Sequence, residues 1–399
     1  MKQRRIICFV ICSSLLFTSG CWDRKELNDR AVWLATGWDA SDKDKVQISG
    51  QMVIPSGMPS ESNGGGSSTK GYLTVSATGQ NVRDAVQNMQ TKLSRQAFFG
   101  QRRIAFWGEE FAKRGIKNEL DASMRDPNVS LRFDAFVVKG GTALEMLNLT
   151  HPLEKIPAGA ALKELEQFGG RAGTSFVNFL VAANSEGMHP TLPAIEIGPF
   201  QNKEDSGQGD SSNTSFQLAG AAIFDDNLKL RGFLNMDENR VLLWIMGVLK
   251  KQTIAVPIKD GNASLLLTKM GSKIVPKISK DHPIKFTVIL TGQGALFENN
   301  SNLDLVQTKN VEFLQHALEK QAKKQVLQTI KKVQEEYGLD IFGFGEAIHK
   351  KDPSNWKSLK KNWDETFSKA DVSVKVHLTI ERIGLTGPSL LYEESEIKK

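Results

Sequence analysis

The amino terminus constrains this chain most strongly, because it sets the compartment and removes most of the cysteines. Three basic residues among the first five precede an apolar run over 6–17, and the small residues 18–20 lead to Cys21. The run is 12 residues long, too short for a bilayer span of about 20, and the pattern is typical of a secretory signal over 1–20. A cysteine directly after the small residues predicts a bacterial lipoprotein signal. The alternative is an ordinary cleaved signal that Cys21 follows by chance.

The cysteine count agrees with a lipid anchor. The chain has three cysteines, Cys8, Cys12 and Cys21, and only Cys21 remains after cleavage. No intramolecular disulfide and no cysteine-based metal site is then possible. We expect an S-diacylglyceryl group on the sulfur of Cys21 and acylation of its new amine. Two or more acyl chains hold a protein stably, so the mature chain is expected on the extracytoplasmic face, anchored to the cell membrane without spanning it.

Composition places the remainder among globular proteins. The 399 residues are 40% hydrophobic and 24% charged, which suits two or three domains with sizeable cores. The formal net charge of +6 falls to +3 once the three basic residues of the signal are removed. This small, dispersed excess does not predict binding to nucleic acid.

The order of elements predicts a multidomain α+β fold with mixed sheets flanked by helices and one long helix in the C-terminal half. A polar segment without large apolar residues is the best candidate for a linker. The expected divisions are a signal peptide over 1–20, an N-terminal α+β region over 21–200 with room for two subdomains, a linker over 201–215, a C-terminal α+β domain over 216–385, and a tail over 386–399 that is expected to be loose from 391 onward.

Alternation and helical spacing predict the elements of the N-terminal region. Thr142 with Glu145 forms a capping box for a short helix, and Thr78 is a candidate cap for the helix after it. Strands are predicted over 31–38, 46–54, 72–77, 104–108 and 133–139, and helices over 82–93, 142–149, 158–168 and 175–184.

The C-terminal region is dominated by one long helical pattern. Apolar residues recur every three or four positions from Val311 to Tyr337, and Gly338 is suited to end the helix. Strands are predicted over 216–224, 229–234, 253–257, 264–269, 273–278, 284–291 and 372–380, and a further helix over 238–249.

A search for catalytic patterns finds none, so we expect no catalytic residues, no bound cofactor and no metal site. The sequence lacks a P-loop, a nucleophile elbow and a His-Glu-x-x-His motif. The histidines are interpreted as isolated structural or surface residues; they are His151, His189, His282, His316, His349 and His377.

Two short segments have alternative interpretations. Asp39, Asp42 and Asp44 offer carboxylates, but their spacing is wrong for an EF-hand, and a solvated hairpin turn is favoured over a cation site. Gly343-Phe344-Gly345 does not follow a strand into a long helix, so a turn between helices is favoured over a phosphate loop.

Trp356, Leu359, Trp363 and Phe367 are spaced as one face of an amphipathic helix that also carries several lysines. One hypothesis is a basic helix on anionic lipid with its tryptophans inserted. The favoured interpretation is an apolar stripe that faces the core.

Two motifs resemble the Ger(x)C family, the lipoprotein C subunits of spore germinant receptors. The first is the mature start, CWDRKELND over 21–29. The second is LDIFGFGE over 339–346, followed by Trp356, Trp363 and Phe367, which is similar to a DxFGFG turn and a W-x6-W helix. Further familiar stretches are Phe98-Phe99-Gly100 and Arg125-Asp126-Pro127.

The resemblance implies a non-enzymatic subunit on the outer face of the inner spore membrane. It implies two polytopic partners, the A-type and B-type receptor subunits, and a role in the response to nutrient germinants. The rival hypothesis is an extracytoplasmic solute-binding lipoprotein with a ligand cleft between its two segments. A wall-modifying hydrolase would need paired acids or a metal site, which the sequence does not show.

Overall fold

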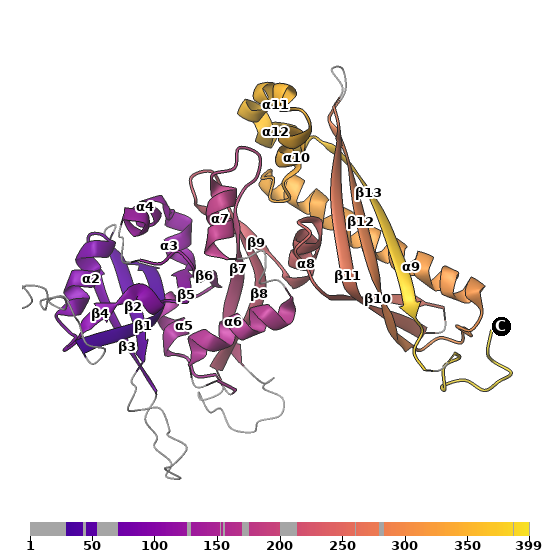
Figure 1. Cartoon of the computed structure of the whole chain (residues 1–399), viewed down its shortest axis with the longest axis horizontal. Coiled ribbons are helices and arrows are strands. Elements are labelled where there is room, and N and C mark those ends of the chain that lie inside the picture. Colours follow the sequence, from indigo (N-terminus) through magenta and orange to yellow (C-terminus); the bar gives the residue numbers. More distant parts are fainter. Residues whose placement is uncertain are drawn as a thin grey trace, which may run out of the picture.

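The structure, a computed structural model, has two lobes side by side, each built on its own sheet (Figure 1). We call the part from β1 to β9 the N-terminal lobe and the part from α8 to the end of the chain the C-terminal lobe. The described residues are 29–42, 45–53, 71–125, 129–151, 153–154, 156–169, 175–199, 214–259, 261–278, 283–385 and 387–398.

The sheet of the N-terminal lobe has the strand order β3-β2-β1-β5-β6-β7-β8-β9, with β4 beside β1. Its centre, from β1 to β7, is parallel, and the outer pairs are antiparallel. The strands are β1 (Arg30–Ala40), β2 (Val46–Val53), β3 (Tyr72–Gly79), β4 (Gln96–Phe98), β5 (Ile104–Gly108), β6 (Asp134–Lys139), β7 (Thr191–Pro199), β8 (Thr214–Phe224) and β9 (Leu230–Leu234).

Helices cover both faces of this sheet. All five residues of β5 are buried, and they divide between two cores: Trp107 packs with α2, α3, α4 and α7, and Phe106 packs with α5 and α6. A strand buried on both faces needs an unbroken apolar run, as β5 has. The helical segments are α2 (Val82–Gln90), η3 (Phe99–Gln101), α3 (Glu109–Arg114), α4 (Lys117–Arg125), α5 (Ala143–Asn148), α6 (Pro157–Phe168) and α7 (Phe176–Ala183).

The sheet of the C-terminal lobe has four strands in the order β10-β11-β12-β13, and the long helix α9 packs on one of its faces. Along β13, Val374, Val376 and Leu378 are buried, whereas the residues between them are exposed. This alternation shows that the second face carries no core. The elements are α8 (Met236–Ile245), β10 (Gln252–Ile258), β11 (Gly261–Lys277), β12 (Lys285–Asn299), α9 (Thr308–Lys332), η6 (Val333–Tyr337) and β13 (Asp371–Arg382).

Short helices between α9 and β13 form a compact unit at one end of the C-terminal lobe (Figure 1). We call residues 339–368 the helical cap. It contains α10 (Phe344–Lys351), α11 (Pro353–Leu359), η7 (Lys360–Asn362) and α12 (Trp363–Ser368).

The α+β class, the mixed sheets and the long helix are confirmed. α9 and the π-helical turn η6 cover the predicted helix, and Gly338 ends it in the left-handed region with φ 66°. The capping box of Thr142 and Glu145 is also present at α5.

Other details of the prediction are wrong. The expected strands 264–269 and 273–278 are one strand, β11, because Gly271 continues the ladder opposite Thr291 of β12. Asn81 caps α2 instead of Thr78, which lies inside β3. The tail is not loose, since Asn310 Nδ2 donates to the carbonyl oxygen of Lys398 at 2.9 Å.

The expected linker over 201–215 does not separate the two sheets. Residues 200–213 lie outside the described residues, but the strands on either side, β7 and β8, are antiparallel neighbours, with Ile197 opposite Phe216. The N-terminal sheet therefore takes its last two strands from beyond the linker, and the change of sheet falls between β9 and β10. The division into folding units over 21–200 and 216–385 stays a prediction.

Candidate functional site

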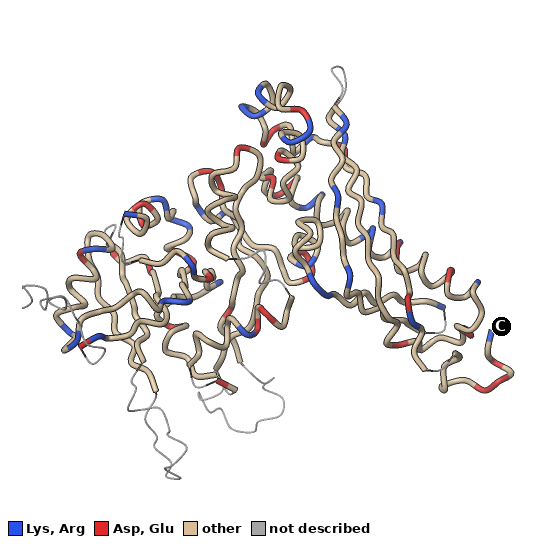
Figure 2. The backbone as a smooth tube through the Cα atoms, in the orientation of Figure 1, with Lys and Arg blue, Asp and Glu red and all other residues tan. Residues whose placement is uncertain are grey.

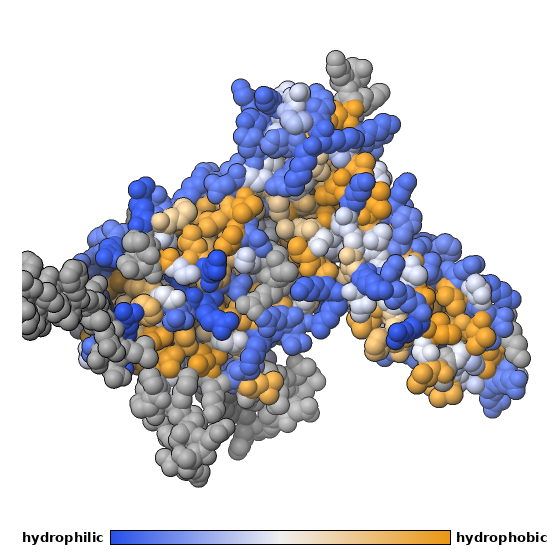
Figure 3. Space-filling model, viewed as in Figure 1, coloured by the Kyte–Doolittle hydropathy of each residue, from blue (hydrophilic) through white to orange (hydrophobic). Residues whose placement is uncertain are grey.

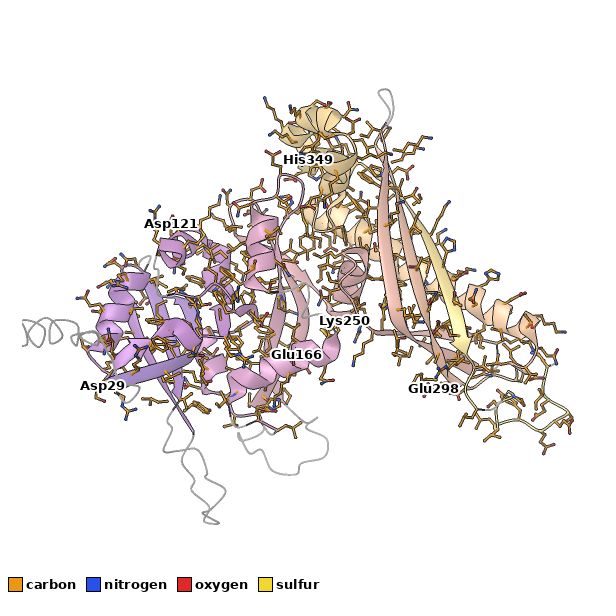
Figure 4. The ribbon with its side chains drawn as sticks, viewed as in Figure 1. Asp29, Asp121, Glu166, Lys250, Glu298 and His349 are labelled. Carbon is orange, nitrogen blue, oxygen red and sulfur yellow. The ribbon has the colours of Figure 1, made fainter. Side chains whose placement is uncertain are left out.

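The predicted anchor, Cys21, lies outside the described residues, so its lipidation stays a prediction. The first described residue, Asp29, lies at the edge of the N-terminal lobe away from the C-terminal lobe (Figure 4). The helical cap, which carries the other motif, lies at the end of the C-terminal lobe that is near α7 of the N-terminal lobe (Figure 1).

The motif over 339–346 folds into a turn around the carboxylate of Asp340. This residue has no exposed surface. Its Oδ1 accepts hydrogen bonds from the backbone N–H groups of Phe342 at 3.0 Å and Gly343 at 2.9 Å, and its Oδ2 accepts from Gly345 N–H at 2.8 Å. The indole Nε1 of Trp363 donates to the same Oδ2 at 3.1 Å. Asp340 therefore fastens the start of α10 to the start of α12.

Burial raises the pKa of Asp340 to about 6, against the opposing effect of these hydrogen bonds. A carboxylate taken out of water loses solvation, and only its donors compensate. The backbone conformation accounts for the glycine at position 343, because this residue caps α10 in the left-handed region with φ 82°. Gly343 thus ends a turn between helices, as predicted, whereas Phe344 and Gly345 already belong to α10.

The tryptophans of the helical cap face inward. Trp356 is 1% exposed and Trp363 is 4% exposed, and their rings meet edge to face at 5.2 Å. The hypothesis of tryptophans inserted into lipid is therefore wrong, and the core-facing interpretation is confirmed. The predicted single helix is two helices, α11 and α12, with the turn η7 between them. The outer surface of the cap is hydrophilic and carries its lysines (Figures 2 and 3).

The helical cap also contacts the N-terminal lobe, at the loop 184–190 between α7 and β7. We call this contact the lobe junction. The backbone N–H of His189 donates to the carbonyl oxygen of Asp340 at 2.7 Å. A Cβ atom built on Gly345 would lie 2.7 Å from the carbonyl oxygen of Gly187, so two backbones approach where side chains would not fit.

Polar side chains extend the lobe junction. Ser185 Oγ donates to Glu346 at 2.9 Å, and Lys360 Nζ lies 2.9 Å from Glu186. The motif thus joins two parts of the chain that lie more than a hundred residues apart.

The lobe junction brings together three ionisable groups that the sequence analysis treats as unrelated. His189 Nε2 lies 3.1 Å from Asp226 Oδ1 and 3.7 Å from Asp364 Oδ1. The His189 side chain is only 5% exposed. Burial raises the pKa of Asp364, as does the charge of Asp226, whereas His189 lowers it.

The interpretation of His189 as an isolated residue is therefore wrong. One ligand atom from each of the three residues lies within 4.8 Å of the others, and within the described ranges this is the one group of histidine, cysteine and acidic residues with such spacing. The set can act as an ion-paired latch or hold a cation. No sequence signal would have found it, because the three residues come from separate loops and helices.

The predicted solvated turn is also wrong for Asp39. This residue is the last but one of β1 and is 5% exposed, and its carboxylate accepts from the backbone N–H groups of Ala143 at 2.7 Å and Leu144 at 2.9 Å. Asp39 thus caps the start of α5 instead of lying in a solvated turn. Burial raises its pKa, and those two hydrogen bonds oppose the rise.

A groove of about 750 Å³ lies where the end of α8, β11 and α10 meet. The rival hypothesis of a solute-binding lipoprotein requires a ligand cleft between the two segments, and this groove lies near that position. Three of the charged groups on its wall already have partners: Lys350 Nζ lies 3.0 Å from Glu346, and Lys351 Nζ donates to the carbonyl oxygen of Pro276. Lys273 also lines the groove. Because of these pairs, Glu346, Lys350 and Lys351 offer no unpaired charge to a ligand.

Two family models match the chain, one on each side of the expected linker. A model described as spore germination protein N-terminal domain matches residues 23–197, and one described as spore germination B3/GerAC like, C-terminal, matches residues 219–384. The chain therefore belongs to the Ger(x)C family of spore germination proteins.

Relatives from Bacillus subtilis (strain 168) match over almost their whole length. Spore germination protein KC is 26% identical, with 96% of this chain and 97% of the relative covered. Spore germination protein B3 is 22% identical, with 94% and 96% covered, and spore germination protein A3 is 24% identical, with 96% and 98% covered.

The crystal structure of the GerBC protein has the same fold. It matches with a TM-score of 0.54 and 20% sequence identity, covering 87% of this chain and 96% of that one. Within the described part of the chain, no helix is both long and apolar enough to cross a bilayer.

Proposed function

We propose that this chain is a lipid-anchored, non-enzymatic subunit of a spore germinant receptor, required for the response to nutrient germinants. Membership in the Ger(x)C family over both lobes is the observation that carries the proposal. The relatives named for germination extend over the same length, so the role assigned to them concerns the whole mature chain.

The anchor follows from the signal that ends at Cys21. With the lipid on Cys21, the chain lies on the extracytoplasmic face of the inner spore membrane and enters the fold at the N-terminal lobe, at Asp29 (Figure 4). The C-terminal lobe is then free to reach the polytopic A-type and B-type subunits.

The end of the C-terminal lobe supplies a surface suited to such a partner. Phe297 of β12 is 69% exposed and Leu385 is fully exposed, and both line one hollow beside Leu296 and Ile383. Adjacent large apolar side chains on a surface commonly mark protein contact sites. We therefore place a receptor contact at this end of the lobe.

The test of the anchor is Cys21→Ala in the intact organism. We expect the protein to move from the membrane fraction to the soluble fraction and nutrient germination to fall, whereas germination by a nutrient-independent trigger stays normal. Unchanged membrane association and unchanged nutrient germination would contradict the proposal. Mass spectrometry of the purified native protein gives a direct check, because the lipidated chain begins at Cys21 with acyl groups attached.

The test of the receptor contact is Phe297→Asp, with Phe313→Asp on α9 as a matched control. Both phenylalanines are exposed, at 69% and 55%, so neither change should disturb the core. We expect the change at Phe297 to reduce co-purification with the polytopic subunits, whereas the change at Phe313 leaves it intact. Equal behaviour of the two variants would place the contact elsewhere.

A further inference from the structure

The N-terminal lobe contains a cavity of about 420 Å³ that the receptor role does not use. It lies between the sheet and the helices α2 and α4. Its walls are largely apolar and include Trp38, Ile48, Val86 and Phe99. A pocket of this size lies within the range that holds small molecules in proteins.

One wall of the cavity carries a buried arginine. Arg102 is 4% exposed, and its guanidinium lies 4.1 Å from the ring centre of Phe133 and 5.4 Å from that of Trp38. Of the five N–H donors of a guanidinium, the described residues engage one, in a long hydrogen bond of 3.4 Å from Nη2 to the carbonyl oxygen of Ser130. Its Nε is buried without a hydrogen-bond partner.

The described residues also provide no ion pair for Arg102. Burial lowers its pKa to about 10, and no carboxylate among the described residues acts against it. A buried charge without a counterion is costly, and stacking on aromatic rings returns only about 2 kcal/mol. The presence of Arg102 at this cost in stability indicates that its guanidinium has a role other than stabilising the fold.

Other polar atoms of the cavity walls are unsatisfied in the same way. Thr36 Oγ1 and Trp38 Nε1 are buried without a hydrogen-bond partner. The described lining includes no Asp or Glu, and its Arg125 is paired with Asp121, whose Oδ2 lies 2.7 Å from Nε, so Arg102 is the buried positive charge that the described lining leaves unbalanced. The potential inside the cavity is therefore positive, and the available groups are mainly donors, which is the chemistry of an anion site.

We infer that this cavity binds a small organic anion, whose carboxylate or phosphate head pairs with the guanidinium of Arg102 while its apolar body packs against Trp38, Val86 and Phe99. The planar guanidinium matches the two oxygens of such a head group. The inference does not depend on the lipid anchor or on a receptor partner. It gives the N-terminal lobe a ligand-binding role beyond the proposed function.

The test measures binding by calorimetry to the full mature chain, with Cys21→Ser so that no detergent competes for the cavity. The probes are phenylacetate, octanoate and phenyl phosphate, and the neutral amide phenylacetamide is the matched control. We expect at least one of the anions to bind, and phenylacetamide to bind at least tenfold more weakly than phenylacetate if phenylacetate is that anion. A preference for phenyl phosphate would identify the head group as a phosphate.

Two variants test the residue and the cavity. Arg102→Met should weaken binding of the anion at least tenfold while the protein melts at the same or a higher temperature, because an apolar side chain replaces an unpaired buried charge. Arg103→Met, at the adjacent exposed position, should leave binding within twofold. Val86→Phe keeps Arg102 and narrows the cavity, so it should weaken octanoate at least fivefold even if the Arg102 variant fails to fold.

The inference would be overturned by any of three results. The first is that none of the three anions binds. The second is that a folded Arg102→Met variant binds the anion as well as the unmodified chain does. The third is that Val86→Phe leaves the affinity for octanoate unchanged, which would place the anion outside the cavity.

Discussion

The two sheets of this protein are buried to different extents. The sheet of the N-terminal lobe lies between two layers of helices and has two cores, whereas the sheet of the C-terminal lobe has one core under α9 and leaves its other face polar. Each lobe also buries one carboxylate at the start of a helix, Asp39 at α5 and Asp340 at α10. The comparison teaches that the C-terminal lobe, which has helices on one face of its sheet instead of two, depends more heavily on its buried carboxylate.

Removal of the two carboxylates should show the largest difference between the lobes. Asp340→Ala leaves three backbone N–H groups and the Trp363 indole N–H without their acceptor, and we expect a loss of about 3–5 kcal/mol in the free energy of unfolding. Asp39→Ala leaves only two N–H groups and should lose about 2 kcal/mol. Urea denaturation followed by circular dichroism measures both; an equal loss would break the comparison.

The pH dependence of stability should carry the signature of Asp340. Its pKa is about 6 in the fold against an ordinary value of 3.8, so its protonated form stabilises the fold below pH 3.8 and this contribution is lost as the pH rises through 6. The expected loss is about 3 kcal/mol. The measurement is the stability of the unmodified chain minus that of Asp340→Asn between pH 4 and 7. A difference that does not change over this range would contradict the raised pKa.

Replacement of two helical glycines with alanine should change the free energy of unfolding in opposite directions. Gly345→Ala places a Cβ atom 2.7 Å from the carbonyl oxygen of Gly187, so the lobe junction must open, and we expect a loss of about 2 kcal/mol. Gly159→Ala on α6 meets no atom within 4 Å and should gain about 0.5–1 kcal/mol. Thermal melting of both variants checks the signs. A neutral Gly345→Ala would show that the junction yields without cost.

Threonine substitutions should sharpen the contrast between the sheets, with the smallest effects. Val137 and Val138 of β6 face opposite cores and are both fully buried, so a change to Thr at either should cost about 1–2 kcal/mol. On β13 only one of two neighbours should matter: Val374→Thr is costly, whereas Lys375→Thr, on the exposed face, should stay within about 0.5 kcal/mol. A costly change at Lys375 would mean that the polar face is covered.

Much of this fold could be predicted from local sequence patterns. The capping box at Thr142 and the terminating Gly338 are chemical signals read within one helical turn, and both were correct. The helices α3 and α4 were missed, because each gives the core only one or two apolar residues, too few for a periodic pattern. The strand β7 was missed because of Pro193, which it tolerates since its ladder with β6 begins one residue later, at Ala194.

The site was less predictable, because its partners are distant in the chain. The turn around Asp340 uses donors two to five residues away, so its motif could be recognised. Asp39 finds its donors 104 residues later, and His189 meets Asp226 and Asp364 from separate elements. No spacing of neighbouring residues in the sequence predicts such contacts. The buried Arg102 was likewise invisible, because an arginine beside a strand is normally exposed.

The position of β13 has a consequence for how the protein is made. This strand pairs in parallel with β12, which lies 86 residues earlier, and it is the last element of the chain. During synthesis, the edge of β12 that β13 later covers therefore stays unsatisfied until residues 371–382 have been made. A nonsense codon before Asp371 would therefore leave that edge of β12 exposed to proteases and to aggregation.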